Sequence, residues 1–304
     1  MSKGNKEWYK LIFKQNQPIH IGKSNWGVIN ETEIFIPGWT MWGALTNTYL
    51  RNRGFKDLNS AKEKFETITN FFPSFDGETI LAPNYKDGEF CLGDFSESEF
   101  RLFFIDTSLK TSVEPILRKA KDEHLYEFDY ILPAPKKEFK KTLNDKGFKD
   151  NLFWIGLIAI EKKTAEEATK NFLKKGLKIF IGGDTRYGFG ELELVKLKKI
   201  NEETNGNEFK QWNIDKDGKF VKNGKDDNGD DKGLRNYFQF FKNDLKFKGE
   251  LVLLPEFNFT QNVPLVEKAE FFITPGSLII DDSFDGRSFT LKKGKFQQIN
   301  QEDL

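Results

Sequence analysis

The order of strand-like and helix-like segments is the feature of this sequence that most restricts its fold. An apolar, strand-like run at residues 8–14 precedes apolar residues at helical spacing from Trp39 to Tyr49. Further strands are predicted at residues 101–106, 126–132 and 153–160. A helix follows, which opens on Thr164 and Glu167 in a capping-box pattern, and the last strand alternates over residues 191–197. Strand, helix and strand therefore occur in that order twice.

This order predicts an α+β protein with a ferredoxin-like (RRM-like) sheet, in which two helices cover an antiparallel sheet. The connections at residues 60–99 and 133–150 would then be insertions, the first with a helix at residues 61–71. Residues 1–200 form the ferredoxin-like domain on this interpretation. Residues 201–233 are rich in Asn, Asp, Gly and Lys, which predicts a flexible polar linker or insertion. Residues 234–304 would form a β-rich C-terminal extension.

Composition limits the class of protein. The formal net charge is +0, which argues against a free-standing nucleic-acid binder. The 32 phenylalanines serve equally well in a core or as stacking surfaces for bases. Cys91 is the only cysteine, so a disulfide framework and a thiolate zinc site are excluded. Without an apolar run of about 20 residues or a signal peptide, we expect a cytoplasmic protein with no membrane partner.

A glycine-rich loop, residues 182–190, lies between the last predicted helix and the last strand. It holds Gly182, Gly183, Gly188 and Gly190, which allow a backbone to approach a ligand closely. Exposed amides of such a loop can hold phosphate, and Arg186 adds a charge-assisted donor. The alternative is a structural turn with one exposed arginine. Neither a Walker motif nor a dinucleotide fingerprint fits, because a strand follows the loop.

Four segments, taken in order, resemble the RAMP superfamily of CRISPR-associated proteins. They are PIHIG at residues 18–22, IFIPGWTMWGAL at residues 34–45, the stretch at residues 111–128, and GGDTRYGFG at residues 182–190. The resembling family patterns are a "plhiG" strand, an "IPGSSLrGalr" helix start, a "tgtA…LY.fE" hairpin and a closing "GG.rsRGfG" loop. The resemblance covers residues 8–198 and lapses beyond residue 200.

The resemblance implies a structural subunit that binds guide RNA (crRNA) in a type III-like antiviral effector complex. Its partners would be CRISPR guide RNA and other subunits, with target RNA as a further candidate. The amides at the start of the first helix would face phosphate. Trp39 and Trp42 occupy positions where the family has small residues. They could serve as stacking platforms for RNA bases, or they could be buried or pack at a subunit interface. The implied RNA-binding residues are Lys23, Trp39, Thr40, Trp42, Arg118, Lys119, Gly182, Gly183, Thr185, Arg186, Tyr187, Gly188 and Gly190.

The same resemblance bears on catalysis. Relatives that cut target RNA carry an Asp in the loop that here spans residues 23–33, and this loop has none; Glu31 and Glu33 are weak substitutes. His20 and His124 are the only histidines for acid–base work, and a structural His20 and a solvated His124 are favoured. The sequence therefore favours binding over catalysis.

Two alternatives stay open. One is an endoribonuclease acting on precursor guide RNA or target RNA, and the other is a β-rich cytoplasmic interaction protein whose motifs match by chance. Residues 213–218 imitate the start of a calcium loop, but Gly224 stands where the loop needs a glutamate. We expect no metal site and no cofactor.

Overall fold

A five-stranded antiparallel sheet organises the first two thirds of the chain in the computed structural model. The structure describes residues 6–56, 58–201, 208–222, 233–241, 245–258, 263–280, 284 and 286–299. The strand order is β11-β12-β1-β10-β4. The strands are β1 (Lys6–Gln15), β4 (Phe72–Ser74), β10 (Phe153–Glu161), β11 (Lys178–Phe180) and β12 (Glu191–Ile200).

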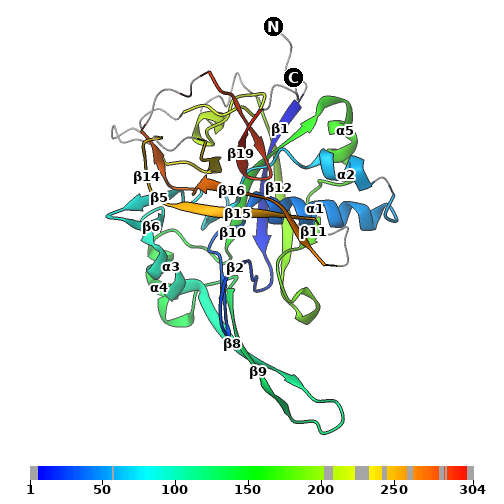
Figure 1. Ribbon diagram of the computed structural model, residues 1–304, viewed down its shortest axis with the longest axis vertical. Coiled ribbons are helices and arrows are strands. Elements are labelled where there is room, and N and C mark those ends of the chain that lie inside the picture. The colour runs from blue at the N-terminus through cyan, green and yellow to red at the C-terminus, as the bar shows by residue number, and fades with distance from the viewer. Residues whose placement is uncertain are drawn as a thin grey trace.

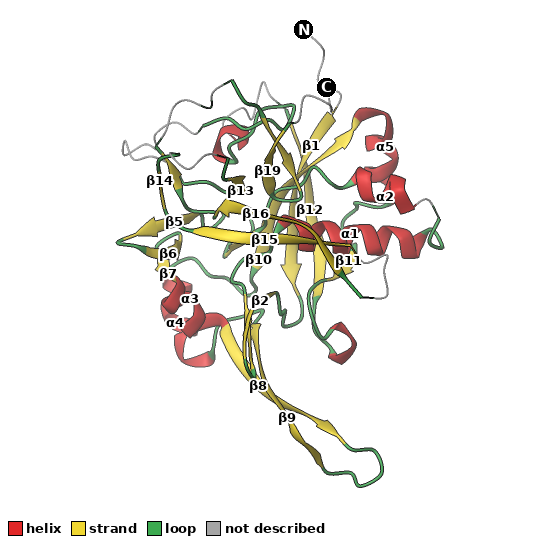
Figure 2. Ribbon diagram, viewed as in Figure 1, coloured by secondary structure: helices red, strands yellow, loops and turns green. Residues whose placement is uncertain are grey.

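Two helices complete the ferredoxin-like pattern. Helix α1 (Gly38–Asn52) connects β1 to β4, and α5 (Lys162–Asn171) connects β10 to β11 and β12. Both helices lie on the same side of the molecule, with α2 (Leu58–Lys64) beside them (Figure 2). Tyr49 of α1 and Phe172 after α5 meet edge to face at 5.2 Å between ring centroids. The predicted α+β class and ferredoxin-like fold are confirmed.

The second strand of this sheet differs from the prediction. Residues 101–106 do not form a strand, because α3 (Glu97–Phe104) occupies most of them. Ser96 caps this helix. Its hydroxyl oxygen accepts a hydrogen bond from the Glu99 amide, and the Glu99 carboxylate accepts one from the Ser96 amide. The buried rings of Phe100 and Phe104 stack one helical turn apart. The sheet strand is instead β4, directly after the expected helix at residues 61–71, of which only α2 forms.

The capping box expected at the start of α5 is also absent. Thr164 lies inside this helix, and its hydroxyl donates to the Glu161 carbonyl. The buried stripe is nevertheless as expected, since Ala168, Phe172 and Leu173 are all buried.

A long hairpin projects from the body of the molecule (Figure 1). It consists of β8 (Ile105–Val113) and β9 (Ala120–Ile131), and we call residues 105–131 the arm. At its base, β2 (Gly22–Trp26) and β3 (Ile29–Thr32) join it in a four-stranded sheet of order β2-β3-β9-β8. The expected strand at residues 126–132 therefore belongs to this second sheet and not to the ferredoxin-like one.

The C-terminal part forms its own five-stranded sheet of order β15-β16-β13-β19-β18. It is therefore not an addition to the first sheet. The smaller elements are a β14-β17 pair, a β5-β6-β7 sheet and helix α4. The bounds are β13 (Tyr237–Gln239), β14 (Phe247–Lys248), β15 (Leu251–Asn258), β16 (Leu265–Ile273), β17 (Leu278–Ile279), β18 (Phe289–Lys292), β19 (Lys295–Gln298), β5 (Pro83–Lys86), β6 (Glu89–Leu92), β7 (Phe95–Ser96) and α4 (Lys140–Asp145).

Residues 208–222 contribute to the core, which corrects the expectation of a flexible linker for this described part of residues 201–233. Phe209, Trp212 and Ile214 are buried. The Trp212 ring lies 6.0 Å from that of Phe72 in β4. Three large apolar side chains in a polar stretch are enough to anchor it, because each buries a large area. The division into domains at residues 200 and 234 stays a prediction.

Candidate nucleic-acid interface

The glycine-rich loop lies directly against the segment at residues 18–22. The Gly183 amide donates to the His20 carbonyl at 3.0 Å, and the Gly190 amide donates to the Pro18 carbonyl at 2.8 Å. Gly182 has φ +75°, and a Cβ there would overlap the His20 carbonyl oxygen. Only glycine adopts this positive φ readily and also leaves room for the His20 carbonyl. Two of the four segments quoted from the sequence are thus held together by backbone hydrogen bonds.

The crest of this loop is a single 3₁₀ turn, η2 (Thr185–Tyr187). Asp184 at φ 55° and Gly188 at φ 84° flank it in left-handed conformations. Arg186 and Tyr187 are exposed on the crest, and Tyr187 keeps 77% of its surface accessible. Within the described residues, Arg186 has no hydrogen-bond or ion-pair partner. The loop therefore presents a cation and an aromatic ring to solvent.

The base of the arm is fastened to the same loop. Lys110 of β8 forms an ion pair with Asp184, and its ammonium lies 4.3 Å from the ring centroid of Phe128. The same ammonium lies 5.0 Å from the ring of Phe189. Cation–π contacts of this kind contribute about 0.5–2 kcal/mol each. Loop and arm therefore form one continuous surface.

His20 supports this junction. Its ring stacks on Phe128 at 4.2 Å between centroids, and its Nδ1 lies 2.7 Å from the Asp129 carbonyl oxygen. A carbonyl only accepts, so Nδ1 carries the hydrogen of this bond. His20 is buried, which fits the structural role favoured from the sequence. His124 lies in β9, and its side chain is outside the described residues.

The start of α1 is covered by the C-terminal extension. The Gly38 amide donates to the side-chain oxygen of Asn70 at 2.8 Å. A Cβ at Gly38 would lie 2.5 Å from the Gly294 nitrogen, in the turn between β18 and β19. The expectation that the first amides of this helix face phosphate is therefore wrong at Gly38, because protein groups occupy that position.

The two tryptophans after Gly38 contact neighbouring parts of the chain. Trp39 lies 5.1 Å from the ring of Tyr237 in β13. The Trp42 indole donates to the Lys62 carbonyl at 2.9 Å, and the Lys293 ammonium lies 3.9 Å from its ring. Both side chains are half-buried, as the packing alternative requires. Their contact with RNA stays a prediction.

The remaining predicted residues are spread over the molecule. Thr40 is half-buried in the first turn of α1, near the tryptophans. Arg118 and Lys119 are exposed at the far end of the arm. Lys23, at the base of the arm, forms an ion pair with Glu97 at 2.9 Å. The predicted set is therefore not one patch but a loop, an arm tip and a covered helix start.

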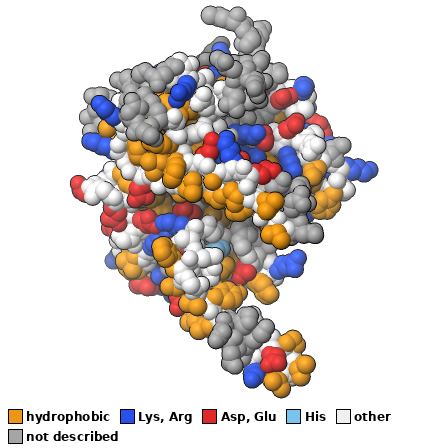
Figure 3. All heavy atoms as spheres, viewed as in Figure 1, with side chains coloured by type: hydrophobic (Ala, Val, Ile, Leu, Met, Phe, Trp, Pro, Cys, Tyr) orange, Lys and Arg blue, Asp and Glu red, His pale blue; other side chains and the backbone are white. Residues whose placement is uncertain are grey.

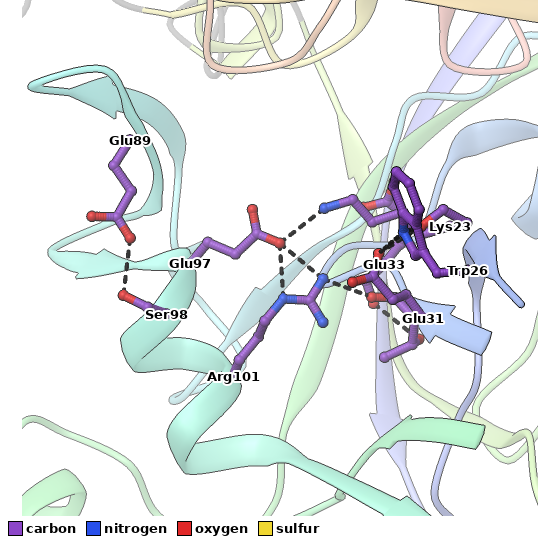
Figure 4. A network of polar contacts seen from close by, with 10 residues as sticks. Lys23, Trp26, Glu31, Glu33, Glu89, Glu97, Ser98 and Arg101 are labelled. Carbon is purple, nitrogen blue, oxygen red and sulfur yellow. Dashed lines mark hydrogen bonds and ion pairs between the residues drawn. The ribbon is translucent and has the colours of Figure 1, made fainter. Parts of the chain in front are cut away.

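Lys23 belongs to a polar network between β2 and α3 (Figure 4). Arg101 ion-pairs with Glu97 at 2.8 Å and donates to the Thr32 carbonyl at 3.0 Å. Glu33 lies beside this group. Burial raises the pKa of Glu33 to about 7, and the Glu97 charge adds to this while Lys23 and Arg101 oppose it.

Glu31 has the opposite character. Its carboxylate accepts from the Ser24 hydroxyl at 2.5 Å and from the Trp26 indole at 3.3 Å. The Ser24 hydrogen bond is the main cause that lowers the pKa of Glu31. Of the two glutamates in the residue 23–33 loop, only Glu33 can exchange a proton near neutral pH.

Several residues of the interface were not predicted from the sequence. Lys110, Phe128, Asp184 and Phe189 join arm and loop, although Lys110 lies more than seventy positions from Asp184. The only sequence signal was the aromatic residues within and beside the glycine loop. Their partners are set by the fold, so spacing along the chain could not identify them.

Two further observations concern other kinds of site. Among the described residues, no three His, Cys, Asp or Glu side chains are grouped so that they could hold a metal ion. In the calcium-like segment, the Asp215 carboxylate instead accepts the amides of Asp217 and Lys219 in a local turn. None of the helices in the described part of the chain has the length and apolar character of a membrane span.

The chain is similar to known proteins both in sequence and in fold. The family model of the RAMP superfamily matches residues 17–193, which include the segment at residues 18–22, the arm and the glycine loop. No curated protein matches the chain.

Two solved structures share the fold, both of type III-B Cmr-beta. One, bound to cognate target RNA and AMPPnP, has a TM-score of 0.53 at 13% identity, over 89% of this chain and 85% of that chain. The other, bound to cognate target RNA, has a TM-score of 0.52 at 12% identity, over 95% of this chain and 99% of that chain. Because the family model spans more than half of the sequence, this chain belongs to the RAMP superfamily.

Proposed function

We propose that this protein is an RNA-binding structural subunit of a type III-like CRISPR effector complex, where it holds guide RNA. Membership of the RAMP superfamily supports this function. The two Cmr-beta structures that share its fold contain cognate target RNA. Its net charge of +0 suits a subunit that grips RNA at a defined surface inside an assembly better than a free-standing binder.

The observation that carries the proposal is the exposed pair Arg186 and Tyr187 on a loop with a fixed backbone. Single-stranded RNA is held by phosphate contacts and by stacking of bases on aromatic rings. An arginine supplies a forked donor for phosphate, and a tyrosine supplies a stacking face. The left-handed residues Asp184 and Gly188 hold both side chains on the crest. Thr185 and the loop glycines would approach the backbone of the same nucleotide.

The arm supplies a second contact in this proposal. Arg118 and Lys119 lie at its exposed end, far from the loop in the view of Figure 1. A nucleic acid that crosses the loop crest and follows the arm would meet cations at both ends. Removing the tip charges should weaken binding without affecting the contact at the loop.

Ultraviolet crosslinking tests the proposal at residue level. The protein is irradiated with a radiolabelled RNA that carries the repeat-derived tag of a CRISPR guide, digested, and analysed by mass spectrometry. We expect a crosslinked peptide that contains Tyr187, and we expect it to disappear in Tyr187→Leu. Tyr9, which is buried and whose hydroxyl donates to the Glu7 carboxylate, serves as the internal control ring. A crosslink found only outside residues 182–190 would contradict the proposed site.

A second function, endoribonuclease activity, is favoured by one observation, the Glu33 carboxyl whose pKa is about 7. A group that titrates near neutrality suits general acid–base cleavage of RNA, which contributes about 10²–10⁴-fold. If this function holds, cleavage of the tagged RNA should be lost in Glu33→Gln and kept in Glu31→Gln. Equal product in wild type, both variants and a no-protein control would rule it out.

A further inference from the structure

The four-stranded sheet at the base of the arm has two faces of different character. In its register, Ile29 of β3 and Leu109 of β8 are both partners of Glu127 in β9. These three side chains therefore share one face, because partners across a ladder point the same way. Trp26 is the partner of Ile29 and joins them. The neighbouring residue Phe128 points to the opposite face, where it contacts His20 and the glycine loop.

The face that bears Trp26 is apolar and open to solvent. Trp26 and Leu109 keep 68% and 64% of their surface exposed, and Ile29 keeps 38%. Leu125, two positions from Glu127 and therefore on the same face, is 54% exposed. These four apolar side chains come from all four strands and surround Glu127, which lies between Ile29 and Leu109. They form a patch rather than scattered surface residues. Apolar side chains also gather at the end of the arm in Figure 3.

The charged residues of this face around Leu109 and Leu125 are acidic, whereas Lys23 and Arg101 lie close enough to Glu31, at its edge, to lower the pKa of that carboxyl. Glu127 lies in the same row as Leu109, Asp129 lies two positions further along β9, and Glu31 lies two positions from Ile29. Among residues 24–31, 105–111 and 125–131, which the structure describes, the alternation places no Lys or Arg on this face. Lys110 points to the other face, where Asp184 neutralises it.

The Trp26 ring is also held in place before any partner binds. Its indole nitrogen donates to the Ser24 hydroxyl at 2.9 Å and to the Glu31 carboxylate (Figure 4). An aromatic side chain that is already fixed loses little conformational entropy when it is buried in an interface. Tryptophan is also among the residues that most often dominate binding energy at protein interfaces.

Charge selects among the possible occupants. RNA would bring phosphates against Glu127 and Asp129, which is unfavourable. A second copy of the same face would bring these carboxylates against one another. A protein surface that carries apolar side chains together with a lysine or arginine would bury the apolar groups and pair with the carboxylates.

We propose that this face, formed by Trp26, Ile29, Leu109 and Leu125, is the docking site for a neighbouring protein subunit with such an apolar and basic surface. The identification of that neighbour as a member of the effector complex rests on the proposed function. On this proposal, the two faces of the sheet divide the work: one fixes the glycine loop for RNA, and the other joins the next protein.

The experiment uses the full chain, affinity-tagged and co-expressed with the proteins encoded beside it. Leu109→Asp is compared with Leu102→Asp, since Leu102 on α3 is similarly exposed, at 52%, but lies off this face. Native mass spectrometry measures which subunits are retained. We expect Leu109→Asp to lower retention of one neighbour at least tenfold and Leu102→Asp to leave it unchanged. A photocrosslinking residue at position 125 should capture that same neighbour.

Charge reversal provides a second, independent test of the docking site. Glu127→Lys should reduce retention of the neighbour, and a Lys→Glu change at the crosslinked position of that neighbour should restore it. Normal assembly of both Leu109→Asp and Glu127→Lys would overturn the docking site. So would loss of RNA binding, with all subunits retained, because this would make the face an RNA surface.

Binding of the tagged RNA by the isolated chain separates the two proposals. If Leu109→Asp prevents assembly and even the wild-type chain fails to bind RNA, the result supports the docking site and contradicts the RNA-binding function. A wild-type chain that stays monomeric with all its neighbours present, yet binds RNA, would overturn the docking site alone.

Discussion

Replacing Gly182 by alanine tests the close packing of the glycine loop on residues 18–22. Gly182 has φ +75°, and the added Cβ would overlap the His20 carbonyl oxygen and lie 3.0 Å from its carbon. Gly188 is the matched control, because its φ is +84° but nothing lies within 4 Å of an added Cβ. Both variants carry the same backbone strain, and only Gly182→Ala adds the overlap.

The expected magnitudes follow from these two causes. A left-handed conformation costs alanine about 1–2 kcal/mol relative to glycine, so Gly188→Ala should lower the free energy of unfolding by that amount. Gly182→Ala should lose a further 1–3 kcal/mol or so from overpacking. The Gly183 amide bond to His20 would also weaken, at a cost of about 1 kcal/mol. We therefore expect a total loss of about 3–6 kcal/mol.

Urea denaturation followed by tryptophan fluorescence measures both variants. The prediction is a lower midpoint for Gly182→Ala than for Gly188→Ala, with an unchanged slope against urea. Equal midpoints would show that the loop can move away from His20 freely. In that case the contact with residues 18–22 would not fix the position of the glycine-rich loop.

Three further predictions concern other parts of the fold. Trp212→Ala should lower the free energy of unfolding by about 3–5 kcal/mol in the same assay. A Gly/Ser replacement of residues 223–232 should change this free energy little, because their composition is polar. A larger loss for the Gly/Ser replacement than for Trp212→Ala would restore the linker interpretation of residues 208–222. Gly294→Ala, whose Cβ would lie 2.8 Å from the Gly38 nitrogen, should destabilise the protein more than Gly286→Ala, which has a similar φ and open space; equal effects would show that the extension does not pack tightly on α1. The carboxyl of Glu33 has an ordinary pKa of 4.5 and a folded-state pKa of about 7, so the folded state keeps a proton that the unfolded state loses, and stability should fall by up to about 3 kcal/mol between pH 4.5 and 7. Urea melts of Glu33→Gln should lack this decline, and a decline equal to that of the wild type would assign it to other groups.

The ferredoxin-like sheet was predictable because its strands and helices carry strong local patterns. Residues 8–14 and 153–160 alternate or run apolar, and both form central strands. The second strand was missed because β4 has only three residues and includes Pro73. Residues 101–106 resemble a strand in sequence because Phe103, Phe104 and Ile105 are contiguous. The capping box formed by Ser96 and Glu99 instead starts a helix there.

The candidate site was predictable only in part. The glycine loop could be recognised from its sequence, since glycines at left-handed and closely packed positions leave a clear pattern. The partners of the loop could not, because Lys110 and Phe128 reach it through the register of the arm. The position of Gly38 was likewise not predictable, because the group that covers it, Gly294, lies some 250 residues away and beyond the resemblance to the family.

The salt dependence of RNA binding shows whether Arg186 of the glycine-rich loop contacts an RNA phosphate. Affinity for the tagged RNA is measured between low and moderate salt for wild type, Arg186→Ala and Lys198→Ala, the last an exposed cation of β12. Loss of one phosphate contact should weaken binding and lower the slope of log affinity against log salt by about 1 for Arg186→Ala. Lys198→Ala should match the wild type. The same affinity and slope for Arg186→Ala and wild type would contradict the claim that the loop holds RNA.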